Sequence, residues 1–302
     1  MARRQALSLK LLDMALTSVA ALQRLLLERA PRAAALLRVV DCSGEARWAR
    51  AHVPSAAPLL LDPALKDPRQ PNAPLPPAAF EALAAALGAA RSSRVVFYDA
   101  AGGVASARAW WLCRLYGLEG ASVLDGGWQA WERAGAPVSS APGDRDAPPV
   151  PAEEAVVARA QPQRLALLQE VVDAARSGAA GAREVQLVDA RCAAEFSGDD
   201  RRGNRFGGRV PGAVCVPHTS LQAPDGTLLP VAALQERFHA AGLRPGVRTI
   251  AYCQMGVRAA AAALALEQAG FADVAVYDGS MREYLNSPGL DGAGLPRASG
   301  AA

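Results

Sequence analysis

Leu37-Arg-Val-Val-Asp41 is a short apolar run that ends in aspartate, and the turn His52-Val-Pro-Ser-Ala56 follows it. The same order of segments returns later in the chain, as Val185-Gln-Leu-Val-Asp189 and then Arg209-Val-Pro-Gly-Ala213. An internal repeat is the first feature to seek in a new sequence, because each copy forms one structural unit. These segments therefore predict two copies of one fold.

Two further pairs of segments repeat in the same order and at similar spacing. Arg94-Val-Val-Phe-Tyr-Asp99 corresponds to Arg248-Thr-Ile-Ala-Tyr-Cys253, and Ala121-Ser-Val-Leu-Asp125 corresponds to Val274-Ala-Val-Tyr-Asp278. Alanine- and leucine-rich stretches with helical composition alternate with such runs, at residues 78–90, 106–116, 231–241 and 259–269. This alternation predicts an α/β protein in which each copy is a parallel sheet flanked by helices.

The length of the chain agrees with a duplication. Its 302 residues are about twice a common domain length of roughly 150 residues. Residues 137–162 are rich in Pro, Ser, Gly and acidic residues without apolar periodicity, which is typical of a linker. We therefore expect a first domain over residues 1–145, with an N-terminal helical extension and the start of the linker, and a second domain over residues 146–302. The role of residues 1–16 stays open.

The composition excludes several classes of protein. With 51% hydrophobic and 20% charged residues, the chain can bury a core and is not intrinsically disordered. Its 32 basic and 29 acidic residues are scattered, which does not favour a nucleic-acid-binding surface. The longest uncharged apolar run, residues 259–266, is far shorter than the ~20 residues that span a bilayer. We expect neither nucleic acid nor membrane as a partner.

The cysteines and histidines do not form a metal-binding or disulfide pattern. The three histidines are far apart, and no two cysteines form a CxxC pair. The odd set of five cysteines is Cys42, Cys113, Cys192, Cys215 and Cys253. This pattern predicts free thiols and no metal site. Because free thiols suit a reducing compartment, we predict a cytoplasmic protein.

Cys253 ends a predicted strand and begins the turn Cys253-Gln-Met-Gly-Val-Arg258, which leads into a helix. Ligands of parallel sheets bind beyond the carboxyl ends of the strands. Backbone N–H groups of such a turn and the helix N-terminus create a positive field, which favours a nucleophilic thiolate. Gly256 permits the positive φ of a tight turn, and Arg258 can fork onto an anionic group. The alternative is that Cys253 is a small buried residue at a strand end.

The corresponding loop of the first copy carries an acid where the second copy carries a thiol. It reads Asp99-Ala-Ala-Gly-Gly-Val-Ala-Ser106 and also follows a predicted strand. Only the second copy can therefore perform thiol chemistry, which makes Cys253 the candidate nucleophile.

From about Ser18 to Pro296, the chain resembles the tandem-domain rhodaneses, a group that contains thiosulfate:cyanide and 3-mercaptopyruvate sulfurtransferases. The matching segments of the first half are Val39-Val-Asp41, His52-Val-Pro-Ser-Ala56, Tyr98-Asp99, Ala109-Trp-Trp111, Leu124-Asp-Gly-Gly-Trp128 and Trp131. Those of the second half are Val188-Asp-Ala-Arg191, Arg209-Val-Pro-Gly-Ala213, Tyr252 to Arg258, and Tyr277-Asp-Gly-Ser280. In that family the amino-terminal domain lacks the catalytic cysteine, as Asp99 implies here.

The resemblance implies a covalent sulfur shuttle. Cys253 would attack the outer sulfur of a small anionic donor such as thiosulfate and become a persulfide, from which cyanide or a thiol removes the sulfur. A persulfide cradle would be formed by the backbone amides of Gln254, Met255, Gly256, Val257 and Arg258. Arg191 and Arg258 would bind the donor, although Arg191 could instead be a surface residue paired with Glu195. The shuttle requires no metal and no organic cofactor.

Departures from the family leave the donor open. Loops of relatives read Cys-Arg-Lys-Gly-Val-Thr or Cys-Gly-Ser-Gly-Val-Thr, whereas Met255 here replaces the Lys or Ser and Arg258 replaces the Thr. Loss of the serine removes a hydroxyl proposed to aid mercaptopyruvate chemistry, and Arg258 supplies a cation, so we favour thiosulfate over 3-mercaptopyruvate. Glu195 stands where several relatives have a second arginine, which weakens this preference.

Two other functions compete with an enzyme that transfers sulfur between small molecules. A persulfide carrier without turnover would need the same thiolate and would pass its sulfur to a thiol-bearing protein. A cysteine phosphatase or arsenate reductase of related fold would use Cys-x5-Arg around phosphate, a loop one residue longer than the Cys-x4-Arg here. Among the remaining candidates, His52 is expected to tie a turn. Four tryptophans are expected to pack in the interior: Trp110, Trp111, Trp128 and Trp131.

Overall fold

A computed structural model describes residues 15–28, 37–59, 62, 65–142, 146, 149–179, 184–288 and 298–300. The chain forms two compact units. The first contains the residues up to Leu65, Leu75–Ala160 and Pro224–Thr227, and the second contains Lys66–Pro74, Gln161–Ala223 and the residues from Leu228 on. The boundary proposed near residue 145 lies before the change of unit at Ala160. The expected N-terminal helical extension falls on residues 1–14, outside the described residues.

The first unit is built on a parallel five-stranded sheet of order β1-β7-β6-β2-β3. Its strands are β1 (Leu16–Thr17), β2 (Leu37–Asp41), β3 (Ala56–Pro58), β6 (Arg94–Tyr98) and β7 (Ala121–Leu124). Apolar residues of α2 (Val19–Leu27) and α7 (Gly127–Arg133) form one core with Val96 and Tyr98. The alternate residues Val95 and Phe97 face α5 (Pro77–Ala86) and α6 (Val104–Leu115). Successive strand residues point to opposite faces, so both faces of this sheet are covered.

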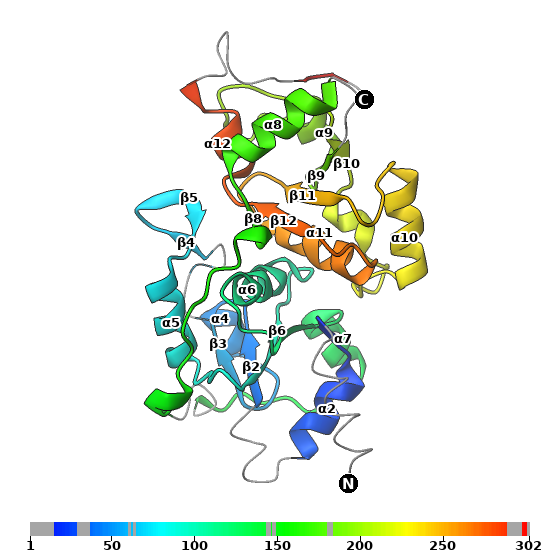
Figure 1. The fold of residues 1–302 in the computed structure, drawn as a ribbon. Helices are drawn as coiled ribbons and strands as arrows, with labels where there is room; N and C mark the ends of the chain where they lie inside the picture. Colours follow the sequence, from blue (N-terminus) through cyan, green and yellow to red (C-terminus); the bar gives the residue numbers. More distant parts are fainter. Residues whose placement is uncertain are drawn as a thin grey trace. The chain divides into compact units, whose positions relative to one another are not determined.

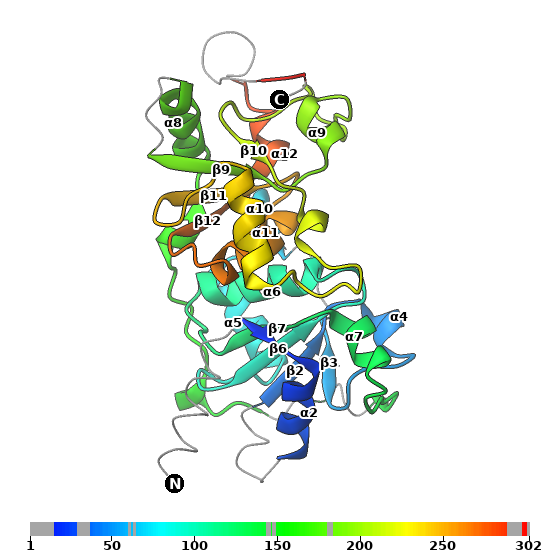
Figure 2. The same cartoon turned by 90° about the vertical axis from the view of Figure 1, so that its right-hand side faces the viewer.

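The second unit repeats this topology with the order β8-β12-β11-β9-β10. Its strands are β8 (Leu165–Ala166), β9 (Val185–Asp189), β10 (Val214–Cys215), β11 (Arg248–Tyr252) and β12 (Val274–Tyr277). Figure 1 shows α8 (Leu168–Ala179) and α12 (Ser280–Tyr284) on one face and α10 (Val231–Ala240) and α11 (Val257–Gln268) on the other. Figure 2 shows α10 and α11 side by side, and α11 packs against β11 and β12.

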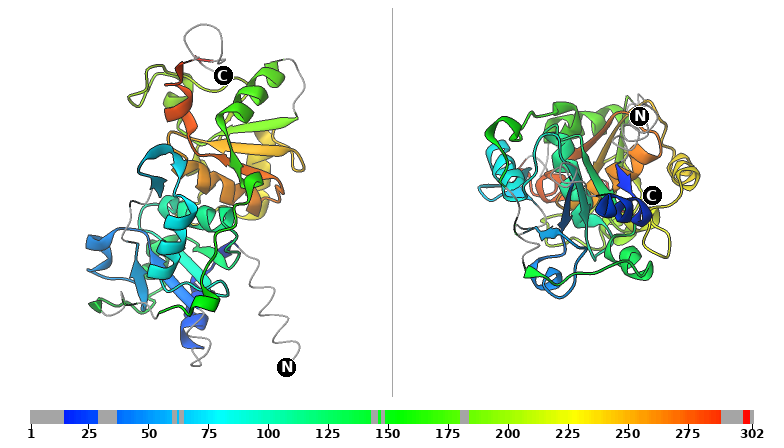
Figure 3. Two further views of the ribbon diagram at one scale, coloured as in Figure 1. Left: turned by 60° about the vertical axis from the view of Figure 1, so that its left-hand side comes forward. Right: turned by 90° about the horizontal axis from the view of Figure 1, so that it is seen from below.

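Short elements complete the two units. They are α4 (Glu45–Trp48), the hairpin β4 (Lys66–Asp67) and β5 (Gln70–Pro74), η2 (Ala152–Glu154), η3 (Pro162–Arg164), α9 (Ala193–Ser197) and η4 (His218–Leu221). The antiparallel β4–β5 hairpin belongs to the second unit although it comes from the first half of the sequence (Figure 3). No described helix is both long and apolar enough to cross a bilayer.

The predicted fold class is confirmed. All six strand runs quoted from the sequence form central or adjacent strands of the two parallel sheets, and all four predicted helices form. The strand order of the two sheets is the same, as a duplicated unit requires. The four tryptophans are buried, as predicted. His52 is buried as well, and its Nδ1 lies 2.8 Å from the carbonyl oxygen of Trp48, which ties the turn.

Candidate active site

Cys253 is the first residue after β11, and it is buried at the carboxyl edge of the sheet. Its backbone N–H donates to Ser280 Oγ at 3.1 Å, and its carbonyl accepts from the N–H of Met281 at 3.0 Å. Ser280 Oγ in turn donates to the carbonyl of Tyr277 at 2.7 Å. The start of α12 therefore fixes the backbone on which the Cys253 thiol is mounted.

Gly256 is the N-cap of α11 and has φ +80°, in the left-handed region that favours glycine. A Cβ at this position would collide with the carboxylate and the carbonyl oxygen of Asp278. The turn from Cys253 to Gly256 is therefore pressed against Asp278. The first backbone N–H groups of a helix have no partner within the helix, and those of Val257 and Arg258 are in the first turn of α11, as the sequence predicted.

Lys66 holds Asp278 from its other side. The Lys66 ammonium donates to the Asp278 carbonyl at 2.7 Å and to its Oδ2 at 2.6 Å, and both side chains are largely buried. Lys66 is in the hairpin β4–β5, far from Asp278 in the sequence. Sequence reasoning missed this residue, because nothing in the polar, proline-rich segment around it signals a contact with the second copy.

The side chains of Gln254 and Met255 are also fixed. Gln254 and Asn204 exchange two amide hydrogen bonds, of 3.0 and 2.9 Å, and Asn286 donates to the same Asn204 oxygen at 3.0 Å. Met255 Sδ lies 3.3 Å from Nη1 of Arg282. The cradle residues that sequence analysis named are thus held in one loop conformation, and their role in persulfide binding stays a prediction.

Arg258 is engaged by a buried acid. Its Nη1 and Nη2 donate to the two carboxylate oxygens of Glu195, at 2.6 and 2.9 Å. The Glu195 side chain is 3% exposed and that of Arg258 is 20% exposed. Burial raises the pKa of Glu195, but the hydrogen bonds and charge of Arg258, with smaller contributions from Cys192 and Arg191, lower it to about 2. The pair is therefore ionised at neutral pH.

Arg191 is buried with a different partner. Its Nε and Nη2 donate to both carboxylate oxygens of Asp189, at 2.6 to 3.1 Å, and Nη2 also donates to the carbonyl of Gly208 at 2.9 Å. The alternative of a surface arginine paired with Glu195 is wrong, since Arg191 is 1% exposed and holds Asp189 instead. Its predicted contact with the donor stays a prediction, and Arg191 connects the end of β9 to the loop at Gly208.

The corresponding loop of the first unit is filled by its own side chain. Asp99 Oδ1 accepts from the N–H groups of Ala101 and Gly103 at 2.8 and 2.9 Å. Its Oδ2 accepts from the N–H and the hydroxyl of Ser106, each at 2.8 Å. Gly103 caps α6 in the left-handed conformation, as Gly256 caps α11. The converging N–H and O–H donors of this loop therefore bind the carboxylate of Asp99, the residue that occupies the position of Cys253.

Three of the other cysteines are suited to packing and not to nucleophilic chemistry. Burial raises the pKa of the thiols of Cys42 and Cys113, and burial with the charge of Asp189 raises that of Cys215 to about 11. Cys192 is exposed, and its Sγ lies 3.4 Å from Glu195 Oε2. Among the described residues, no group of three or more His, Cys, Asp or Glu side chains could hold a metal ion.

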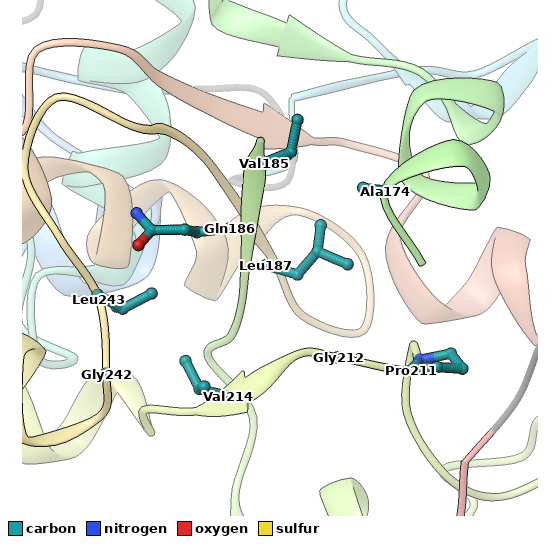
Figure 4. Close-up of a pocket in the computed structure, with 9 residues that line it drawn as sticks. All are labelled: Ala174, Val185, Gln186, Leu187, Pro211, Gly212, Val214, Gly242 and Leu243. Carbon is teal, nitrogen blue, oxygen red and sulfur yellow. The ribbon is translucent and has the colours of Figure 1, made fainter. Parts of the chain in front are cut away.

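The cavity in Figure 4 lies away from this site. It is lined by residues of α8, β9, the turn before β10 and the loop at Leu243, and its volume is about 10 Å³. That is room for about one water molecule. The cavity lies at the amino end of β9, around Val185, whereas Cys253 follows the carboxyl end of the parallel neighbour β11. It is therefore not part of the candidate active site.

Comparisons with known proteins agree on one family. The Rhodanese-like domain profile matches residues 21–134 and 173–287. The chain is 31% identical to the thiosulfate sulfurtransferase of Gallus gallus, over 85% of this chain and 89% of that protein. It is 30% identical to the 3-mercaptopyruvate sulfurtransferase of Homo sapiens, over 85% of this chain and 87% of that protein. It is 34% identical to a mitochondrial thiosulfate/3-mercaptopyruvate sulfurtransferase of Arabidopsis thaliana, but the match spans only 59% of the plant protein.

Solved structures show the same fold. An anaerobic ergothioneine biosynthesis enzyme from Chlorobium limicola superimposes with a TM-score of 0.81 at 22% identity, over 95% of this chain and 71% of that chain. At this identity the likeness concerns the fold alone.

Proposed function

The chain belongs to the Rhodanese-like domain family, and from this we propose that it moves a sulfane sulfur from a small anionic donor, through a persulfide on Cys253, to a thiophilic acceptor. It is an enzyme of the thiosulfate or 3-mercaptopyruvate sulfurtransferase type, as its relatives are.

The reaction proceeds in two displacements. With thiosulfate, the Cys253 thiolate attacks the outer sulfur, the S–S bond of the donor breaks, and sulfite leaves with the bonding electron pair. With cyanide as acceptor, its carbon attacks the outer sulfur of the persulfide, and thiocyanate leaves while the thiolate is restored. A thiol acceptor, small or on a protein, takes the sulfur in the same way and becomes a persulfide. Two such half-reactions predict ping-pong kinetics.

One observation carries this proposal. Cys253 begins the turn into the N-terminus of α11, and the matching turn of the first unit holds the carboxylate of Asp99 with four hydrogen bonds. Preorganised N–H donors stabilise the charge that develops in a reaction without reorganising. The amides from Gln254 to Arg258 would do so for the terminal sulfur of the persulfide.

The donor, the acceptor and the compartment are proposed in more detail. The sequence favours thiosulfate because Arg258 is a cation, but in the structure this cation is paired with Glu195, so thiosulfate and 3-mercaptopyruvate are both candidate donors. Cyanide, a small thiol and a thiol-bearing protein are candidate acceptors. We place the protein in the cytoplasm, since all five cysteines are free and free thiols suit a reducing compartment.

Replacement of Cys253 tests the proposal. We expect Cys253→Ser to lower thiocyanate formation from thiosulfate and cyanide, and pyruvate formation from 3-mercaptopyruvate, by more than about 1,000-fold, because the covalent step is lost. Cys113→Ala is the matched control, since Cys113 is a free cysteine in α6 of the first unit, and it should leave both rates, counted per folded molecule, within about twofold. Mass spectrometry of the donor-treated wild type should show about 32 Da added to the Cys253 peptide, the mass of one sulfur.

Three results would contradict the proposal or favour a competing function. Sulfur transfer that survives Cys253→Ser would exclude Cys253 as the carrier. A stable persulfide with no turnover until a protein acceptor is added would favour the carrier function. Hydrolysis of p-nitrophenyl phosphate that Cys253→Ser abolishes would favour the phosphatase.

A further inference from the structure

The guanidinium of Arg258 is bound to a carboxylate before any donor arrives. Both of its terminal nitrogens donate to Glu195, in the bidentate geometry that is strongest for arginine. Glu195 belongs to α9, which follows β9, and Arg258 is in the first turn of α11, five positions after Cys253. The two residues therefore join the elements that follow two neighbouring strands, at the edge where Cys253 lies.

Glu195 is held in place for this contact. Its Oε2 accepts from the Cys192 thiol at 3.4 Å as well as from Arg258, and the exposed Arg202 lies 3.8 Å from its Oε1. A buried carboxylate that lost Arg258 would have to stay charged with little solvent or take up a proton, and either outcome is costly. Arg258 cannot fork onto a donor without leaving Glu195 in that condition.

The pairing changes the charge that the site offers. An unpaired arginine near Cys253 would attract an anion with a full positive charge, whereas the pair has no net charge. Coulomb energy is proportional to the charge of the ligand, so this neutralisation costs a dianion about twice as much attraction as a monoanion. Thiosulfate carries two negative charges at neutral pH, and 3-mercaptopyruvate carries one on its carboxylate.

We propose that Glu195 is a specificity-determining residue, which cancels the charge of Arg258 and shifts the site from dianionic donors such as thiosulfate toward singly charged, carboxylate-bearing thiol donors. This inference rests on the proposed function. It reverses the preference for thiosulfate that the sequence alone indicates, because that preference depends on Arg258 being a free cation.

The opposing interpretation is that the pair only holds α9 to α11. Loss of a structural tie would lower the rates with both donors together, because the loop at Cys253 would loosen for either donor. Release of charge would instead change the ratio of the two kcat/KM values. The ratio therefore separates the two roles.

The experiment compares kcat/KM for thiosulfate with kcat/KM for 3-mercaptopyruvate at low ionic strength. We expect Glu195→Gln to raise the thiosulfate-to-mercaptopyruvate ratio about tenfold, because Arg258 regains its full charge. Arg258→Gln should lower the same ratio by a similar factor, since Glu195 then presents a negative charge without its bidentate partner and with the exposed Arg202 near it. Salt of about 0.5 M should reduce both changes by screening. The matched control is Asp199→Asn, which removes an exposed acid next to α9 and should leave the ratio within about twofold.

The two replacements make the test robust to poor folding of one variant, because they predict opposite shifts. If both lower the two donors equally, Glu195 is a structural tie and the inference is wrong. If the wild type forms no persulfide on Cys253 with either donor, the proposed function itself fails. If the persulfide forms but neither replacement changes the thiosulfate-to-mercaptopyruvate ratio of kcat/KM, only the inference fails.

Discussion

At the scale of single residues, Glu195 is a buried acid that remains charged because of its neighbours. Its pKa is about 2, below the ordinary value of 4.5, since the hydrogen bonds and charge of Arg258 exceed the penalty of burial. A carboxyl whose pKa is lower in the folded than in the unfolded state stabilises the fold above the unfolded value. That stabilisation is lost as pH falls through the folded value. The relevant window is therefore from about pH 4.5 down to about pH 2.

This linkage predicts a pH-dependent difference between two proteins. Near neutral pH, Glu195→Gln should lower the free energy of unfolding by roughly 2 to 3 kcal/mol, because the variant lacks the ionised form that Arg258 stabilises. At pH 3 the difference in free energy of unfolding between the two proteins should be less than half as large. At that pH the wild type has already lost much of the stabilisation that comes from ionised Glu195. Denaturant unfolding of both proteins at pH 6 and pH 3 measures it. A difference that does not change with pH would mean that Glu195 stabilises the fold by packing and not by charge.

The residues of the site divide into those that the sequence could predict and those that it could not. The place of Cys253 and the left-handed turn at Gly256 follow from local order: strand, glycine, helix. The partners of Arg258 and Arg191 were not predicted, and only that of Arg258 is brought close by the tertiary fold. Asp189 is two positions from Arg191 and is a local partner in hindsight. Glu195 is far from Arg258 in the sequence, and no local pattern connects them.

At the scale of elements, the hairpin β4–β5 supports the loop that carries Cys253. Lys66 is in this hairpin and holds Asp278, whose carboxylate and carbonyl press on Gly256. Three strands of each sheet, β2, β6 and β7 and then β9, β11 and β12, were predictable from short apolar runs rich in β-branched residues. The hairpin was not, because Gln70–Pro74 is polar and proline-rich and has no alternation of apolar residues. The hairpin supports the Cys253 loop through the contact of Lys66 with Asp278 and not through burial of apolar side chains.

Removal of that lysine tests the role of the hairpin. Lys66→Met should lower the free energy of unfolding by about 2 to 4 kcal/mol, because the buried Asp278 carboxylate is left without its ammonium partner. It should also slow persulfide formation by about tenfold in the protein that remains folded, since the backing of Gly256 loosens. Stopped-flow measurement of sulfite release reports that rate. Arg69→Met is the control on the same hairpin, because Arg69 is 84% exposed and should have little effect.

Addition of Asp278→Asn to Lys66→Met gives the decisive comparison at this scale. The double variant removes both charges, so it should recover part of the lost stability. Equal sulfite release in the wild type and Lys66→Met would show that the hairpin does not position the catalytic loop.

At the scale of the whole molecule, one topology is used twice for two purposes. Both sheets have the same strand order, and both loops end in a left-handed glycine that caps a helix. In the first unit the converging N–H groups bind Asp99 permanently, so that loop contributes to stability. In the second unit the same position holds the Cys253 thiol, which we propose gains and loses a sulfur atom. The position after the start of α6 that corresponds to Arg258 is Ala105, so the first loop also lacks a cation.

These different roles predict that replacements in the two loops have opposite effects: one lowers the free energy of unfolding, and the other abolishes sulfur uptake. Asp99→Asn should lower the free energy of unfolding by about 2 to 4 kcal/mol, because an amide cannot accept all four hydrogen bonds and places N–H groups against donors. Sulfur uptake by Cys253, counted per folded molecule, should stay within about twofold of the wild type. Cys253→Ser should do the reverse, abolishing sulfur uptake at a cost of about 1 kcal/mol or less. Denaturant unfolding with mass spectrometry of the donor-treated proteins measures both quantities. Loss of sulfur uptake in folded Asp99→Asn would mean that the loop of the first unit takes part in the chemistry, and the separation of stability from catalysis would be wrong.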